Sequence, residues 1–340
     1  MKSFFTYLLV PFFLFSFPTQ KQMEEMSTAP YRIVFIHLGT ELPSYAATAL
    51  MQARLFNPNA AILLIASQAA LDATPIAEKD WMILPVESLQ KTSDHLEFCR
   101  LSRLDKSFRN GFWYYTTERL FCLDDFITQY NLNDTFHLEN DNLLYCNLEE
   151  LLPVFHEYYE GMAIPFEQDF RGGAGIVFVT NHTSINALAR HLKNNISRNK
   201  SEMELLGTFK TSLGQKYICP LPVINSEYVR DHLPLTDLMG RRDLFDPNDY
   251  SYCIEQFQSI FDMCSYGQYI GGIDPRNGSD GPGYINPSAI FNCSQLDLTW
   301  ELDSEGRNVP YMAYHGKKYR INNLHIHCKN LQKYSSLETR

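Results

Sequence analysis

Two carboxylates, Glu139 and Asp141, stand two positions apart at the end of a run that reads as a buried strand. The run covers residues 135–138, Thr-Phe-His-Leu. Apolar runs of this length are typical of parallel sheets, and two acids at i and i+2 can aim at one point. Hard oxygen ligands there suit Mg²⁺ or Mn²⁺, completed by water and diphosphate oxygens. The pair predicts a metal site for a nucleotide; two acids that simply end a strand in a solvated loop are the alternative.

The segments on either side of this acid pair read as helices. Residues 112–131 carry apolar side chains at helical spacing, which predicts an amphipathic helix that brings Arg119 close to the acids. A second helix is expected from residue 148 to about residue 160. The acid pair is therefore expected at a strand end between two helices, with a guanidinium nearby.

This order of segments resembles the GT-A glycosyltransferases, especially the glycogenin-like and bacterial lipopolysaccharide galactosyltransferase group. The resemblance rests on Thr-x-x-Arg-Leu-Phe at residues 116–121, Glu-Asn-Asp at 139–141 and Leu-Glu-Glu-Leu at 148–151. It implies that Glu139 and Asp141 bind Mn²⁺ or Mg²⁺ and that Arg119 orients the donor, a nucleoside-diphosphate sugar. Glu139 stands where the family's usual motif has an aspartate.

The first strand-helix-strand unit is expected at residues 32–36, 46–56 and 61–65. Strands joined in this way are parallel, and ligands bind at their carboxyl ends. His37, Gly39 and Ser67 follow the two strands and are candidates to line a nucleotide base and ribose; an ordinary loop histidine is an equal alternative for His37. Neither strand is followed by a Gly-x-Gly-x-x-Gly or Walker loop, which disfavours the dinucleotide and P-loop folds.

Three small residues, Gly173, Ala174 and Gly175, precede a predicted strand at residues 176–179. Small residues before a β-branched run let another group approach the backbone closely. The resemblance implies that this segment lies against the transferred sugar, with Gly173 where the family has asparagine. A plain structural turn explains the glycines equally well.

A buried-looking segment at residues 260–277 contains polar side chains that need partners. The resemblance implies that Asp262 and Gln268 face the donor sugar and its reacting carbon, with Asp274 behind them. These three are the predicted catalytic residues. A helix cap is the alternative role for Asp262.

The C-terminal segment is predicted to form a β-hairpin from residues 296–302 and 309–315. After a second turn, His325, His327 and Lys329 alternate along a stretch that is expected to be extended, so they share one face. The resemblance implies that a histidine of this face completes the metal site, preferably His327 with His325 in support, and that Lys329 binds the diphosphate. Polar residues that blunt a hairpin edge are the alternative.

Composition limits the class of protein. The chain has 340 residues, 45% of them hydrophobic, and a formal net charge of −10. This charge argues against a nucleic-acid-binding protein, which would need a basic face. The eight cysteines form no Cys-x-x-Cys pair and no zinc spacing. Their even number permits disulfides, but buried free thiols fit at least as well.

The N-terminus carries an apolar run behind Lys2. Its length suits a signal peptide or a short membrane anchor within residues 1–26, which would place the protein in the secretory pathway or at a membrane. Translation from Met23 or Met26 is the alternative and would leave the protein in the cytoplasm.

The rest of the chain is expected to form one α/β domain at residues 27–335, with a nucleotide-binding half at 27–145 and an acceptor-binding half at 146–335. The resemblance implies a Rossmann-type, mostly parallel central sheet flanked by helices and extended by the C-terminal hairpin. A long aperiodic region at residues 217–248 is interpreted as an acceptor-binding lid.

These features lead to the hypothesis of a metal-dependent glycosyltransferase that moves a hexose from a nucleoside-diphosphate sugar to a hydroxyl of a glycan, lipid or protein. The resemblance implies that the anomeric configuration is retained. Two other classes stay open. A sugar-nucleotide nucleotidyltransferase would share the fold but should carry a basic glycine-rich loop after the first strand. A non-catalytic secreted carbohydrate-binding or interaction protein would explain the leader and the aromatic residues.

Overall fold

The computed structural model describes residues 18–76, 80–196, 200–214, 216–233 and 246–337. Most of the predicted leader and part of the predicted lid lie outside these ranges. Within them, no helix is long and apolar enough to cross a membrane. Helix α1 (Gln20–Thr28) spans the predicted boundary at residue 26: Met26 is buried, and Arg32 donates from Nε to its carbonyl at 2.6 Å.

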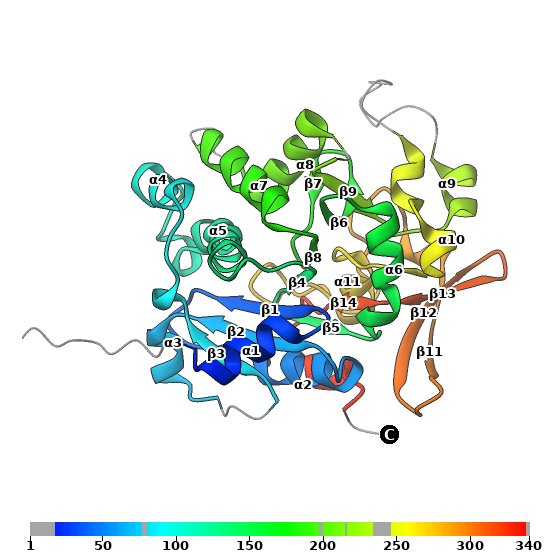
Figure 1. The fold of residues 1–340 in the computed structure, drawn as a ribbon. Coiled ribbons are helices and arrows are strands. Elements are labelled where there is room, and N and C mark those ends of the chain that lie inside the picture. The colour runs from blue at the N-terminus through cyan, green and yellow to red at the C-terminus, as the bar shows by residue number, and fades with distance from the viewer. Residues whose placement is uncertain (1–17, 77–79, 197–199, 215, 234–245, 338–340) are drawn as a thin grey trace, which may run out of the picture.

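The central sheet contains eight strands in the order β3-β2-β1-β4-β8-β6-β7, with β9 paired to β6 (Figure 1). Their bounds are β1 (Arg32–His37), β2 (Ala61–Ala66), β3 (Met82–Pro85), β4 (Thr135–Leu138), β6 (Met162–Gln168), β7 (Arg171–Gly172), β8 (Ile176–Val179) and β9 (Ile218–Leu221). The neighbours β3, β2, β1 and β4 are parallel, whereas β8 is antiparallel to both β4 and β6. The α/β architecture with a mostly parallel sheet is therefore confirmed.

The parallel strands form because their sequences are apolar on both faces. In β2 every residue is buried, and in β1 only the last residue, His37, is partly exposed. Such strands need helices on both sides. Figure 1 shows β1 and β2 between α2 (Ala46–Phe56) on one side and α5 (Phe112–Tyr130) on the other. The expected strand-helix-strand unit is thus present, and its carboxyl ends lie at the edge where the acid pair follows β4.

The other helices are mostly short. They are α3 (Gln68–Ala73), α4 (Ser93–Leu101), α6 (Leu148–Tyr158), α7 (His182–Asn194), α8 (Glu202–Leu213), α9 (Ser226–His232), α10 (Ile254–Phe257), α11 (Ser265–Gly271) and α12 (Leu331–Tyr334), with 3₁₀ turns η1 (Val86–Ser88), η2 (Phe108–Asn110), η4 (Pro247–Ser251) and η5 (Cys293–Gln295). A capping box starts α8, since Ser201 and Glu204 each accept a backbone N–H of the other. This cap sets the direction in which Glu202 leaves the helix.

The C-terminal strands form two further sheets, one of which includes β5 (Asn142–Leu144). Their strands are β10 (Ser259–Ile260), β11 (Asp297–Leu302), β12 (Asn308–Tyr314) and β13 (Lys317–Ile321) in one sheet, and β5 with β14 (Asn323–His325) in the other. The predicted hairpin is present as β11 and β12. Because β5 begins directly after Asp141, its antiparallel pairing with β14 brings the C-terminal histidines to the acid pair.

The prediction of one extended stretch through Lys329 is wrong. Strand β14 ends at His325, the His327 N–H donates back to the His325 carbonyl at 3.0 Å, and Lys329 has a left-handed backbone with φ of 62°. The chain therefore turns after β14, and its side chains meet the site from a turn. All eight cysteines are free thiols; five of them are buried and three are partly exposed.

Candidate active site

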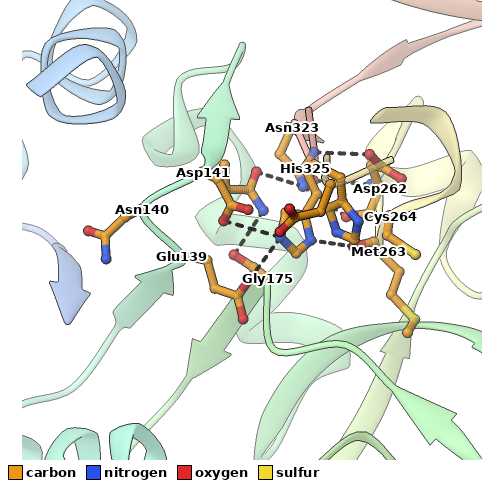
Figure 2. Close-up of polar contacts among 12 residues, drawn as sticks. Glu139, Asn140, Asp141, Gly175, Asp262, Met263, Cys264, Asn323 and His325 are labelled. Atoms are coloured by element: carbon orange, nitrogen blue, oxygen red, sulfur yellow. Dashed lines mark hydrogen bonds and ion pairs between the residues drawn. The ribbon is translucent and has the colours of Figure 1, made fainter. Parts of the chain in front are cut away.

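A tight turn between β4 and β5 presents the acid pair. Glu139 donates its N–H to the Gly175 carbonyl at 3.0 Å, and Asn142 donates its N–H to the Glu139 carbonyl at 3.0 Å. The turn directs both carboxylates at one point, where they meet His325. Ligand atoms of Glu139, Asp141 and His325 all lie within 4.8 Å of one another, and Figure 2 shows the imidazole against both acids.

The His325 ring is held in one orientation. Its Nδ1 donates to the Met263 carbonyl at 2.8 Å, which leaves Nε2 facing the acids at 2.8 Å from Glu139 Oε2 and 3.2 Å from Asp141 Oδ1. Burial lowers the pKa of His325, but Asp141 and Glu139 together raise it well above its usual value. A backbone carbonyl on Nδ1 is the usual way to fix the tautomer whose Nε2 binds a metal.

Two cations flank the acid pair. Arg119 Nη2 lies 2.6 Å from Glu139 Oε1 and 3.0 Å from Glu202 Oε1, and the Lys329 ammonium contacts Asp141 Oδ2. Burial alone would raise the pKa of each acid. Arg119 and His325 instead hold the pKa of Glu139 well below its usual value, and Lys329 with His325 does the same for Asp141. Both carboxylates are therefore ionised, as a metal ligand must be.

Glu202 is a site residue that the sequence analysis did not identify. It stands at the first position of α8, is only 5% exposed, and shares Arg119 with Glu139. Burial raises the pKa of Glu202 to about 7, against the lowering effect of Arg119. The available signal was the Ser-x-x-Glu capping box at residues 201–204, which marks the helix start but does not reveal the distance to Arg119.

Asp262 lies behind the site and does not line the cleft. It is fully buried and accepts three backbone N–H groups: from Tyr266 at 3.0 Å, Gly267 at 2.9 Å and His325 at 3.0 Å. Burial and the neighbouring Glu167 raise its pKa to about 7 in spite of these bonds. Its position matches the helix-cap alternative, because it joins the start of α11 to the end of β14 (Figure 2).

His327 and Gln268 form a second layer next to His325. Gln268 donates from Nε2 to His327 Nδ1 at 2.8 Å, and burial together with His325 lowers the pKa of His327 to about 3. His327 is therefore neutral and lines the cleft, but His325 is the histidine that contacts both acids. The order of preference between the two histidines is the reverse of the prediction.

A cleft of about 1250 Å³ opens over this cluster. The predicted site residues that line it are His37, Gly39, Arg119, Glu139, Asp141, Asp274, His325, His327 and Lys329. Aromatic side chains of Tyr45, Phe108, Phe112, Trp113 and Tyr115 also line it. Asp274 forms an ion pair of 2.6 Å with Arg276, and this pair lies at the wall rather than behind Asp262.

The remaining predicted site residues do not line the cleft but support the segments that form it. Ser67 caps α3 and donates from Oγ to the Gly39 carbonyl. Gly173 faces Met263, Ala174 is buried, and the Gly175 carbonyl accepts two hydrogen bonds from the acid turn. A Cβ at Gly175 would lie 3.0 Å from His325 Nδ1, so the small residue lets the imidazole approach.

The ligand atoms of the acid cluster, which consists of Glu139, Asp141 and His325, suit a divalent cation. Two ionised carboxylates and one imidazole nitrogen converge within 4.8 Å, which matches the hard oxygen and imidazole ligands that Mn²⁺ accepts once the ion displaces the proton on His325 Nε2. The longer side chain of Glu139 reaches the same point as Asp141, so the glutamate does not prevent a shared site. Glu139, Asp141 and His325 would hold the ion.

No protein-family model matches the chain, and neither does any curated protein. Solved structures do match in part. Mouse xyloside xylosyltransferase 1 matches at 14% identity and a TM-score of 0.40, over 60% of this chain and 90% of that one. Glycosyltransferase GlyE of Streptococcus pneumoniae matches at 12% identity and a TM-score of 0.36, over 55% of this chain and 44% of that one. Galactosyltransferase LgtC, in complex with donor and acceptor sugar analogues, matches at 11% identity and a TM-score of 0.35, over 64% of this chain and 84% of that one. These similar structures are glycosyltransferases.

Proposed function

We propose that this protein is a metal-dependent glycosyltransferase that moves a hexose from a nucleoside-diphosphate sugar to a hydroxyl of a glycan, lipid or protein. One observation carries the proposal: Glu139, Asp141 and His325 converge at the floor of a large cleft, flanked by two cations. Carboxylates at a strand end together with positive charges are what a diphosphate site requires.

The charge of each site residue indicates its role toward the donor. A divalent ion bound by Glu139, Asp141 and His325 would supply positive charge to the diphosphate leaving group. The Lys329 ammonium, whose side chain is 25% exposed, can turn from Asp141 toward a phosphate oxygen in the cleft. Arg119 stays between the partly exposed Glu139 and the buried Glu202, so its guanidinium is held in place before the donor arrives.

The shape of the cleft suits a donor and part of an acceptor. Ligand pockets commonly measure about 300–1,000 Å³, and the cleft exceeds this range at about 1250 Å³. His37 lies at the carboxyl end of β1, where its buried Nε2 has no hydrogen-bond partner among the described residues. A Cβ at Gly39 would lie 2.6 Å from that atom, so only a glycine lets the imidazole pack against this loop.

Replacing one metal ligand tests the proposal. Asp141→Asn should reduce sugar transfer and donor hydrolysis at least about a hundredfold, because loss of one charge-stabilising group typically costs 10²–10³ in rate. It should also remove the Mn²⁺-dependent thermal stabilisation by a nucleoside diphosphate. In the unchanged protein, about 100 Kd of a ligand adds roughly 2.7 kcal/mol to the free energy of unfolding.

Asp297→Asn is the matched control, because Asp297 is an exposed acid at the start of β11. It should keep both activity and stabilisation. Full activity in Asp141→Asn would contradict the metal site. The reaction product separates the classes: a transferase releases nucleoside diphosphate, whereas a nucleotidyltransferase releases pyrophosphate. Binding of a glycan without turnover of any nucleotide sugar would instead favour a carbohydrate-binding protein.

A further inference from the structure

A second group of metal-ligating side chains lies between α4 and α5, outside the cleft. It contains His95 and Cys99, one helical turn apart on α4, and Glu118 on α5. Ligand atoms of the three lie within 4.8 Å of one another. Figure 1 shows α4 at the edge of the molecule, next to α5. None of the three residues lines the cleft, so this group is distinct from the acid cluster.

Two of the three separations between the ligand atoms match a tetrahedral ion. Glu118 Oε1 lies 3.2 Å from His95 Nε2 and 3.5 Å from Cys99 Sγ. Zinc binds nitrogen and oxygen at about 2.0 Å and sulfur at about 2.3 Å, so a tetrahedron around it has an N–O edge of about 3.3 Å and an S–O edge of about 3.5 Å. The two measured separations agree with these edges.

A carboxylate on Nδ1 fixes the orientation of the His95 ring, as is usual for metal-binding histidines. His95 is fully buried, and its Nδ1 lies 2.5 Å from Asp125 Oδ2. Asp125 is itself fixed, because it accepts the Thr92 N–H at 2.7 Å. A carboxylate on Nδ1 directs Nε2 at the ion and raises its basicity. Nε2 here points at Glu118 and at the point shared with Cys99.

A cation already occupies the shared point. The Lys91 ammonium lies 2.9 Å from His95 Nε2, 3.2 Å from Glu118 Oε1 and 3.6 Å from Cys99 Sγ. One positive charge is thus surrounded by the three ligand atoms. The Lys91 side chain is 39% exposed, so it can move into solvent and leave the point to an ion.

We propose that His95, Cys99 and Glu118 bind Zn²⁺, with a water as fourth ligand, and that the ion fastens α4 to α5. Thiolate and imidazole ligands select zinc over magnesium, whereas the acid cluster of the cleft contains no sulfur. Cysteine spacing in the sequence did not predict this site, because only one of its three ligands is a cysteine. The proposal does not depend on glycosyl transfer.

Co²⁺ provides the direct test, because a thiolate ligand produces a near-ultraviolet charge-transfer band. The full chain titrated with CoCl₂ should show this band, and ZnCl₂ should abolish it by displacement. Cys99→Ser should lack the band. Cys328→Ser should keep it, although Cys328 is also partly exposed. Lys91→Met should bind Co²⁺ at least about tenfold more tightly, since the competing charge is gone.

A second measurement needs no variant. ZnCl₂ should slow alkylation of Cys99 by iodoacetamide, read by peptide mass spectrometry, while Cys253, another partly exposed thiol, should react at an unchanged rate. Equal alkylation of Cys99 with and without ZnCl₂ would overturn the proposal. So would a charge-transfer band that survives in Cys99→Ser, or Co²⁺ binding that is unchanged or weaker in Lys91→Met.

Discussion

At the scale of single residues, the site is a chain of alternating charges. Lys329, Asp141, His325, Glu139 and Arg119 follow one another in contact, and Glu202 ends the chain. Buried charges of this kind persist only when each has a partner, and removal of one partner typically costs about 3–5 kcal/mol. Each member therefore holds its neighbour in place as well as in its charged form.

Glu202→Gln tests whether the charge at the end of this row of side chains is needed to hold Arg119 in place. The amide keeps the shape but cannot ionise, whereas Glu202 above its pKa of about 7 carries the charge that holds Arg119 opposite Glu139. A hydrogen bond to a charged group contributes about 1.5–3 kcal/mol, so sugar transfer should fall about ten- to a hundredfold. Steady-state kinetics with the donor measure this loss.

Glu204→Gln is the matched control on the same helical turn. Glu204 accepts hydrogen bonds from Ser201 in the capping box, and an amide oxygen can keep them. Activity should remain near that of the unchanged protein. A similar loss in both variants would mean that the helix start is disturbed, and no loss in Glu202→Gln would show that Arg119 is held without it.

At the scale of elements, the site depends on a strand pair that is distant in sequence. Strand β14 pairs with β5, and α11 packs behind β14. Gly267 allows this packing, because a Cβ there would lie 2.0 Å from the His325 carbonyl oxygen and 3.1 Å from Asp262 Oδ2. The helix therefore sets the position of His325 through its backbone.

Gly267→Ala should move β14 away from the acid turn. Alanine favours a helix over glycine by about 1 kcal/mol, but overpacking against backbone typically costs about 1–3 kcal/mol. We expect a lower free energy of unfolding and weaker Mn²⁺ binding, measured by denaturant titration and calorimetry. Gly281→Ala, where a Cβ meets nothing within 4 Å, should change neither. Unaltered Mn²⁺ affinity in Gly267→Ala would argue against control of His325 by α11.

At the scale of the whole molecule, buried acids make the stability depend on pH. Asp124 is 1% exposed and accepts hydrogen bonds from Thr92, Thr128 and Asn186, which lie on three different segments. Burial outweighs these bonds and raises the pKa of Asp124 to about 6. Between the usual carboxyl pKa and this value, the folded state binds more protons than the unfolded state, so stability falls as pH rises.

Asp124→Asn should remove this penalty. The amide remains neutral: its oxygen can accept from Thr128 and Asn186, and its NH₂ can donate to the Thr92 hydroxyl. The variant should therefore be more stable than the unchanged protein at pH 7, by up to about 3 kcal/mol. The difference should vanish below about pH 4, where the acid is protonated in both states. Urea unfolding across this range measures it. Asp72→Asn, an exposed acid on α3, should leave the curve unchanged. A variant that is less stable at pH 7 would contradict the argument.

The amino-acid sequence alone determined the elements whose patterns are local. Apolar runs predicted β1, β2, β4 and β8, and helical spacing predicted α2, α5 and α6 to within a few residues. The acid pair was found for the same reason, because a strand that ends in Glu-x-Asp is visible in a short window. The approach of Arg119 was also predictable, since α5 leads directly into β4.

Only the tertiary structure decided which distant residues meet these elements. His325 rather than His327 contacts the acids because β14 stops at that residue and the chain then turns. Glu202 joins Arg119 across 83 residues, and Asp262 lies behind the site as a support for His325 and α11. Periodicity cannot reveal such contacts, because strand pairing and helix packing choose partners by shape and burial, not by distance along the chain.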